Sequence, residues 1–210
     1  MISIRRPRIE RIENLLEAAG ESPLTYPHEG MVRDAKPDEQ APAGYRHDYA
    51  ATLLGEGQEV FERASQALRE WCMFPPAMAE LYHRDTPIEV GRVVAVLFGG
   101  YGIWTLNPAR ILYTIDEQGE RSRFGFGYGT LSGHLARGEE RFMVEWDRET
   151  DEVVFSISAM SRPHHFLSWI GYPMLRREQR RFRRLAGEAM RDAVAEDKVT
   201  AAPEDPDDGK

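Results

Sequence analysis

The residues from Phe124 to Gly129 alternate between aromatic side chains and glycine. In a strand, neighbouring side chains point to opposite faces, so this pattern places three rings on one face and three glycines on the other. The glycine face, centred on Gly127, would let a ligand or a helix approach the backbone, and the aromatic face with Tyr128 could wall a cavity. The same pattern also suits a strongly curved sheet whose aromatic residues fill the core. Ligand contact and core packing are therefore both open for this strand.

These glycines do not form a nucleotide-binding motif. Gly125 and Gly127 match the first two glycines of a dinucleotide fingerprint, but Thr130 stands where the third is required. The sequence contains neither a phosphate-binding loop ending in Gly-Lys-Ser/Thr nor a Gly-x-Ser-x-Gly nucleophile elbow. The enzyme classes built on these motifs therefore have no support.

The histidines are the next candidates for chemistry. No two of them have the i,i+4 spacing of a helical zinc site, and Cys72 is the only cysteine, so we expect no metal and no cofactor. His134 follows a predicted strand, and His164 and His165 lie where the sheet leads into the last helix. His134 and one of this pair could act as acid and base at a pocket mouth. The alternative is that they are solvated loop residues or helix caps.

Glu178 and Gln179 interrupt the apolar stripe of the last predicted helix, between Met174 and Phe182. A carboxylate on a buried stripe is costly unless it is paired or faces a hydrated cavity. Glu178 would then be a polar anchor in a binding pocket, whereas in the alternative both side chains reach out to the edge of the helix. The candidate partners on the sheet are Arg123, Arg141 and Arg162.

The same helix carries six arginines within nine residues: Arg176, Arg177, Arg180, Arg181, Arg183 and Arg184. Such a run could contact nucleic acid or lipid head groups. The formal net charge of the chain is −8, however, and aromatic residues are not interleaved with the arginines. These features favour a solvated helix face, and we expect no nucleic-acid partner.

The elements that must position these residues follow from hydrophobic periodicity. A period of 3.6 predicts helices over 8–19, 60–72 and 173–194, and a period of two predicts strands over 45–54, 90–98, 110–116, 123–131, 139–146 and 153–160. The five-residue polar loop 147–151 requires antiparallel neighbours. We therefore predict an α+β fold in which the long last helix lies across the concave face of a curved antiparallel sheet.

Length and composition set the boundaries of this prediction. The 210 residues suit one core with appendages, which we divide into a leader with one helix and a proline-rich loop (1–43), a main domain (44–194) and an acidic, disordered tail (195–210). The longest apolar run, 93–98, is far shorter than the ~20 residues of a membrane span. Residues 1–20 have no apolar core typical of a secretory signal. With one cysteine, the chain is expected to be cytoplasmic.

Several of these segments together resemble a known family. The sequence over 123–131, the Gly133-His134 pair and the residues 138–142 are similar to the bacterial and plant family catalogued as domain of unknown function nineteen-ninety. Supporting segments are 24–27, 44–46, 54–55, 110–113, 161–164, 171–173 and 179–182, so the resemblance covers roughly 10–194. It implies a helix-grip fold of the birch-allergen and START type, a group that mostly binds apolar small molecules between the sheet and the C-terminal helix. The leader before the first predicted strand could cap such a pocket.

The function that we favour is non-enzymatic binding or carriage of a hydrophobic small molecule in that cavity. An enzyme of the same fold, using His134, His164 or Glu178 for proton transfer, is the first alternative. An interaction module acting through the arginine face is the second. The residues that we expect to contact the ligand are Gly127, Tyr128, His134, Arg141, Arg162, His164, Glu178 and Phe182.

Overall fold

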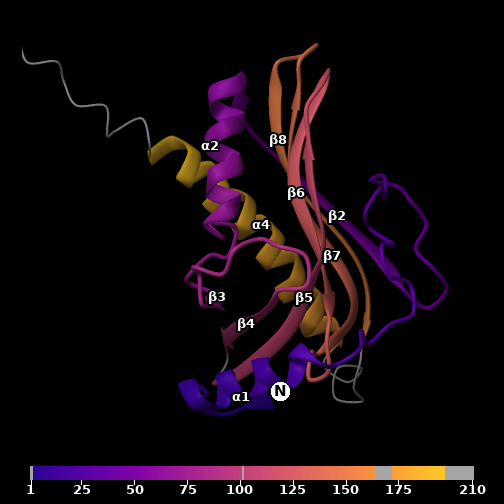
Figure 1. Ribbon diagram of the computed structural model, residues 1–210, viewed down its shortest axis with the longest axis vertical. Coiled ribbons are helices and arrows are strands. Elements are labelled where there is room, and N and C mark those ends of the chain that lie inside the picture. Colours follow the sequence, from indigo (N-terminus) through magenta and orange to yellow (C-terminus); the bar gives the residue numbers. More distant parts are fainter. Residues whose placement is uncertain (1, 101, 164–171, 197–210) are drawn as a thin grey trace, which may run out of the picture.

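The computed structural model describes residues 2–100, 102–163 and 172–196. A curved antiparallel sheet is crossed on its concave face by a long C-terminal helix (Figure 1). The strands follow the order β2-β8-β7-β6-β5-β4-β3, and β1 pairs with β5. The strands are β1 (Ile2–Ser3), β2 (Arg46–Glu56), β3 (Ala79–Tyr82), β4 (Val93–Gly100), β5 (Ile103–Glu117), β6 (Arg121–Thr130), β7 (Ala136–Asp147) and β8 (Glu152–Pro163); the helices are α1 (Ile9–Gly20), α2 (Gln58–Arg69) and α4 (Tyr172–Glu196).

The predicted α+β, helix-grip architecture is confirmed by this arrangement. Strands β3 to β8 are neighbours in chain order, and β2 pairs with the far edge of β8. The structure also contains β1 and β3, which were not predicted from the sequence. They have two and four residues, and strands this short do not display a period of two. Helix α4 extends to Glu196, two residues past its predicted end. His164, His165 and the tail 197–210 lie outside the described residues.

The inner face of the sheet carries the aromatic half of the alternating stretch. Phe126 stacks on Phe142 of β7, with ring centroids 5.4 Å apart, and meets Trp71 edge-on at 5.0 Å. Phe74 joins this cluster to Phe182 of α4, at 5.8 Å between centroids. Each of these rings contributes roughly 1.5–3 kcal/mol through burial. The aromatic face of β6 is therefore part of the core that fixes α4 against the sheet.

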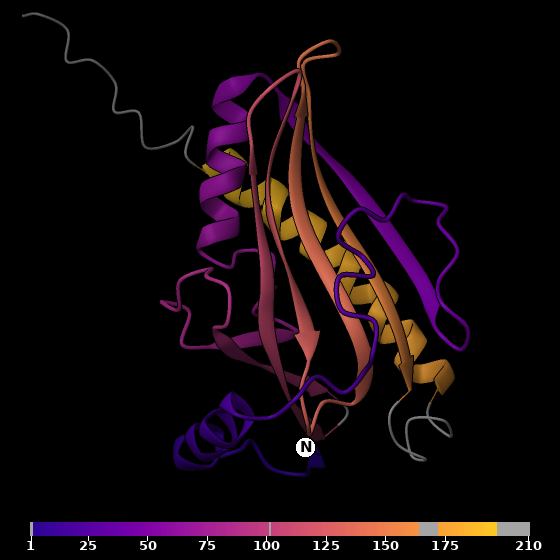
Figure 2. The ribbon, with the colours of Figure 1, turned by 45° about the vertical axis from the view of Figure 1, so that its right-hand side comes forward.

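The glycine half of the stretch lies on the opposite, outer face of β6. The ring of Tyr113 lies over Gly127, and Tyr26 lies over Gly129, so a side chain at either glycine would collide with a phenol. Tyr26 belongs to the proline-rich segment (residues 21–44), which packs on this outer face (Figure 2). The glycines thus provide room for two tyrosines.

Glu139 of β7 holds the proline-rich segment in place. Its buried carboxylate accepts hydrogen bonds from the hydroxyls of Tyr26 at 2.9 Å and Tyr113 at 3.2 Å, and from the backbone N–H groups of Gly30 and Val32 at 2.8 and 3.4 Å. Burial and the charge of Glu139 raise the pKa of both tyrosines, so both hydroxyls remain donors.

Arg141, two residues further along the same strand, adds a second attachment. Its guanidinium donates to the carbonyl oxygens of Arg33 at 2.6 Å and Ala35 at 3.4 Å. The leader was expected as a possible cap of the pocket. These contacts place its proline-rich part on the outer face instead, and Ile2 of β1 reaches the cavity described below.

Helix α1 covers another part of the outer face, over β4 and β5. Its buried Ile12 packs with Ala95, Leu97 and Leu106, whose side chains point away from α4. Strand β4 is thus covered on both faces, which explains its nearly continuous apolar sequence.

The glycine face gives the first prediction. Replacing Gly127 by alanine should lower the free energy of unfolding by about 1–3 kcal/mol, because the new methyl group displaces the buried, hydrogen-bonded ring of Tyr113. The measurement is urea unfolding. Gly119→Ala is the matched control, since a methyl group there meets open space. Equal stability of the two variants would show that the Tyr113 ring does not constrain this face.

Candidate functional site

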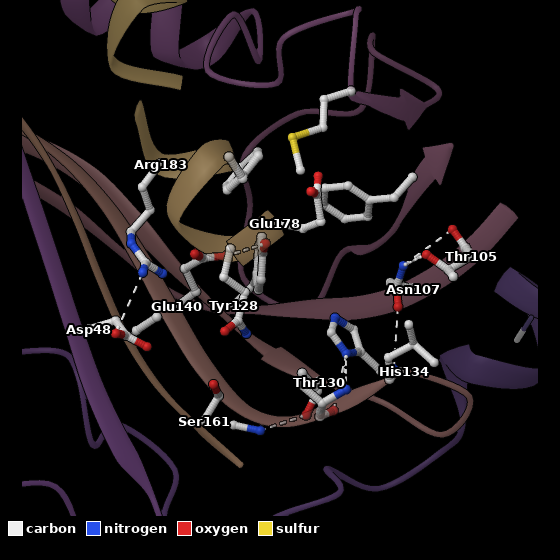
Figure 3. Close-up of a pocket in the computed structure, with 18 of the residues that line it drawn as sticks. Asp48, Thr105, Asn107, Tyr128, Thr130, His134, Glu140, Ser161, Glu178 and Arg183 are labelled. Atoms are coloured by element: carbon white, nitrogen blue, oxygen red, sulfur yellow. Dashed lines mark hydrogen bonds and ion pairs between the residues drawn. The ribbon is translucent and has the colours of Figure 1, made fainter. Parts of the chain in front are cut away.

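A cavity of about 340 Å³ lies between the inner face of the sheet and the N-terminal half of α4 (Figure 3). Its apolar lining includes Met78, Phe98, Ile103, Leu135, Ala159 and Phe182. Its polar lining includes Asp48, Tyr128, His134, Glu140, Glu178 and Arg183. The cavity is therefore a mainly apolar space with hydrogen-bonding groups gathered along the sheet and α4.

Four of the lining residues form a row in register across four strands. Tyr128 of β6 is paired with Glu140 of β7, Glu140 with Ala159 of β8, and Ala159 with Asp48 of β2. Paired residues on adjacent antiparallel strands point to the same face, so all four face α4. Ala159 is the small member of the row, and its methyl group leaves space between the two carboxyl groups. Arg183 of α4 reaches into this region from above (Figure 3).

Tyr128 and Glu140 form the first polar pair of the row. The hydroxyl of Tyr128 donates to Oε2 of Glu140 at 2.7 Å. Burial raises the pKa of Glu140, and it outweighs the opposing effects of the Tyr128 hydrogen bond and the charge of Arg183. Burial also raises the pKa of Tyr128 well above its ordinary value. The cavity therefore contains a carboxyl group that takes up a proton more readily than an exposed glutamate.

Asp48, at the other end of the row, pairs with two arginines of α4. It accepts hydrogen bonds from both terminal nitrogens of Arg176, and Nη2 of Arg183 lies 3.5 Å from Oδ1. Burial acts to raise the pKa of Asp48, but the Arg176 hydrogen bonds and the charge of Arg183 outweigh it and lower the pKa. The side chains of all three residues are 9% exposed. This buried charge cluster ties the N-terminal half of α4 to strand β2.

Glu178 lies at the cavity, on the side of α4 that faces the sheet (Figure 3). Its Oε2 is 3.3 Å from Nη1 of Arg181 on the same helix, so its ion pair is local. The three candidate partners on the sheet have other contacts: Arg123 binds Glu145 at 2.6 Å, Arg141 binds the proline-rich segment, and Arg162 lies over the ring of Tyr45 at 4.8 Å.

His134 lies at the end of the cavity formed by the β6–β7 connection. Its Nδ1 is 3.0 Å from the backbone nitrogen of Ala136 and 3.1 Å from the carbonyl oxygen of the same residue, so contacts with the local backbone hold the ring. Asn107 of β5 supports this connection, because its Oδ1 accepts the N–H of Leu135 at 3.3 Å. Both His134 and Asn107 line the cavity (Figure 3).

The eight residues expected to contact a ligand therefore separate into groups. Tyr128, His134, Glu178 and Phe182 line the cavity. Gly127 and Arg141 face the outer side, under Tyr113 and the proline-rich segment, because they alternate with the inward residues of β6 and β7. Arg162 stacks on Tyr45, and His164 lies outside the described residues.

Sequence reasoning missed several polar residues of the cavity, including Asp48, Asn107, Glu140 and Arg183. The signal for Arg183 was present: Arg176 and Arg183 are seven residues apart, so they share one face of the helix. The arginine run was expected to be a solvated face, and that interpretation is wrong for these two side chains. Their acidic partner lies on β2, far away in the sequence.

Residues 2–100, 102–163 and 172–196 contain neither a metal-ligand cluster nor a helix that could span a membrane. No three histidine, cysteine, aspartate or glutamate side chains in these ranges come together as metal ligands. In the same ranges, every helix is too short or too polar to cross a bilayer.

The charge cluster gives the second prediction. Asp48→Asn should lower the free energy of unfolding by about 3–5 kcal/mol, because two buried guanidinium groups lose their counter-charge. Glu188→Gln is the control: it removes one carboxylate from an exposed ion pair with Arg184 and should cost about 1 kcal/mol or less. If urea unfolding gives similar losses for the two variants, the Asp48 cluster does not anchor α4.

Glu140 gives the third prediction. Its pKa is higher in the folded than in the unfolded chain, so its stabilising contribution is complete below the unfolded pKa and is lost as the pH rises through the folded pKa. Glu140→Gln mimics the protonated form at every pH. The melting temperature of the variant relative to the parent should therefore increase as the pH is raised from about 4 to about 8. Glu149→Gln, in the exposed turn between β7 and β8, is the control. If the difference in melting temperature between Glu140→Gln and the parent does not change with pH, the raised pKa of Glu140 is contradicted.

Comparison with known proteins reveals relatives of similar length. A UPF0548 protein of Dictyostelium discoideum is 32% identical over 195 residues, which make up 87% of this chain and 90% of the relative. A UPF0548 protein of Arabidopsis thaliana is 30% identical over 197 residues, or 90% of this chain and 95% of the relative. A UPF0548 protein of Deinococcus radiodurans is 33% identical, over 86% and 92% of the two chains.

Solved structures are more distant. Norcoclaurine synthase of Thalictrum flavum aligns with a TM-score of 0.47 and 12% identity, covering 77% of this chain and 99% of the enzyme. Human STARD10 aligns with a TM-score of 0.47 and 9% identity, covering 93% and 82% of the two chains. The model of the family described as Domain of unknown function (DUF1990) matches residues 25–189. This match covers more than half of the sequence, and the chain therefore belongs to the DUF1990 family.

Proposed function

We propose that this protein binds a mainly apolar small molecule in the cavity between the sheet and α4, without converting it chemically. The observation that carries the proposal is the cavity itself, which has a volume of about 340 Å³. Elsewhere, packed apolar and aromatic side chains fill the inner face of the sheet. Pockets for small molecules have volumes of about 300–1,000 Å³ and mostly apolar walls. The wider helix-grip group that the sequence resembles uses the same region for apolar ligands.

The polar groups of the cavity suggest how such a ligand would be oriented. Phe182 would pack against its apolar body, while Tyr128, His134 and Glu178 would contact a polar group at one end. Glu140, in its protonated form, would donate a further hydrogen bond. The ligand class that fits is a compact apolar molecule carrying one or two hydrogen-bonding groups.

The leader has a structural role in this proposal. Its proline-rich part covers the outer face through Glu139 and Arg141, so it stabilises the sheet behind the cavity. The excess of acidic residues and the single cysteine agree with a cytoplasmic protein that does not bind nucleic acid.

The direct experiment is native mass spectrometry of the protein purified from its own host. We expect a fraction of the protein to carry an added mass of a few hundred daltons, the size that a cavity of this volume accepts. Extraction into organic solvent would then release the bound molecule for identification. If the protein shows only the mass of its own chain after several gentle purification procedures, stable carriage of a ligand would be contradicted.

A cavity-filling substitution gives the fourth prediction. Ala159→Leu adds apolar volume to the centre of the row and should weaken binding of the neutral apolar dye Nile red by about tenfold, measured by fluorescence titration. Ala18→Leu, on the exposed side of α1, is the control and should bind the dye like the parent protein. Unchanged dye binding by a folded Ala159→Leu variant would show that the dye site lies elsewhere.

A second candidate function is proton transfer to or from the bound molecule. The observation that favours it is the hydrogen-bonded pair of Tyr128 and Glu140, whose carboxyl group is shifted towards the protonated form at a cavity wall. Incubating the extracted molecule with the protein separates the two functions. An unchanged mass and exchange pattern in deuterated water favours carriage, whereas hydrogen exchange that is lost in Glu140→Gln favours catalysis.

A further inference from the structure

A second hollow, of about 520 Å³, lies between α4 and the edge strand β2. We name it the arginine groove. Its floor includes the small residues Ala50, Ala51 and Thr52 of β2. Tyr49, six arginines and two acids complete its lining; the charged residues are Arg46, Arg176, Arg180, Arg183, Arg184, Arg191, Asp48 and Glu188. The groove thus has a formal excess of four positive charges, although the whole chain is acidic.

Helical spacing and one glycine create this groove. The arginines of α4 recur at intervals of three, four and seven residues, so they share the side of the helix that faces β2. At Gly187 the helix approaches β2 so closely that a side chain would collide with Thr52. This close approach brings the guanidinium groups alongside the strand, where they line a concavity. The two elements run side by side (Figure 2).

The acids of the groove do not balance its arginines. Asp48 is shared among Arg46, Arg176 and Arg183. Glu188 pairs with Arg184 at 2.6 Å. Burial lowers the pKa of Arg183 although the charges of Asp48 and Glu140 act to raise it. The neighbouring charges of Arg176 and Arg180 act in the same direction as burial. Repulsion among these guanidinium groups raises the free energy of the unliganded protein, and a bound anion would reduce this repulsion.

The geometry of the groove suits phosphate groups in particular. Guanidinium groups bind phosphate oxygens through two parallel N–H donors. Because they are weakly hydrated, they readily exchange bound water for phosphate. Arg180 and Arg184 are one helical turn apart, roughly 6 Å along the axis, so two linked phosphates can each meet one of them. Because β2 is an edge strand, its outward backbone N–H groups add donors beside the arginines. Arg191 already uses one outward carbonyl, that of Leu53, at 3.3 Å.

We propose that the arginine groove is a binding site for a compact polyanion with at least two linked phosphate groups. The site is separate from the apolar cavity. Asp48 and Arg183 form the wall between the two spaces, since both residues line both of them. The arginine run of the sequence is therefore a recognition surface for phosphate as well as an anchor of α4.

The test is isothermal titration calorimetry with sodium tripolyphosphate at low ionic strength, where screening is weak. The parent protein should bind in a saturable manner, and the double variant Arg180→Ala/Arg184→Ala should bind about tenfold more weakly or worse. The control Arg5→Ala/Arg11→Ala removes the same charge from exposed positions outside the groove and should stay within about twofold of the parent. Circular dichroism verifies that each variant is folded.

Three results would overturn the proposal. The first is the lack of saturable heat with the parent protein. The second is an equal loss of affinity in both double variants, which would mean a response to net charge alone. The third is co-sedimentation with phosphatidylserine vesicles without tripolyphosphate binding, which would assign the groove to a membrane surface. Nile red binding is measured in parallel. A loss of tripolyphosphate binding at the groove can then be distinguished from a loss of apolar ligand binding at the cavity.

Discussion

The buried contact of Asp48 with Arg176 and Arg183 is the interaction on which the arrangement of α4 depends. A helix that lies across a curved sheet needs a fixed angle and register, and here ion pairs act together with the apolar packing of the core. The three side chains supply directional contacts at one point, where strand β2 forms the edge of the sheet. Because removing charges from water is costly, the pairing must be nearly complete to be tolerated. The cavity lies on one side of this point and the arginine groove on the other.

The consecutive glutamates of β7 show how a period of two gives identical side chains different environments. Glu139 points outward and accepts hydrogen bonds from two tyrosines and from the backbone of the proline-rich segment. Glu140 points inward and meets one tyrosine and the cavity. The outer carboxylate is surrounded by donors, whereas the inner one has fewer and a raised pKa. Glu139 therefore holds the proline-rich segment on the sheet, and Glu140 lines the cavity.

The fold was predictable from the sequence because its strands are long and regular. The alternation over 123–131 and the short loop after Trp146 identify an antiparallel sheet, and the stripe through Phe182 identifies the helix that covers it. The outer face was not predictable in this way. Arg141 was expected at a ligand, but its partners are carbonyl groups of an irregular segment whose path no period reveals. Asp48 and Arg176 were equally hidden, because a buried ion pair across 128 positions leaves no local pattern.

Arg183 connects the two proposed sites electrostatically. It borders both spaces, and its charge opposes the effect of burial on the pKa of Glu140 while it lowers the pKa of Asp48. A phosphate group in the groove would partly neutralise Arg183 and so weaken its influence on Glu140. The pKa of Glu140 would then rise further, and its carboxyl group would be protonated over a wider pH range. By linkage, a ligand that prefers protonated Glu140 in the cavity and a polyanion in the groove would each strengthen the binding of the other.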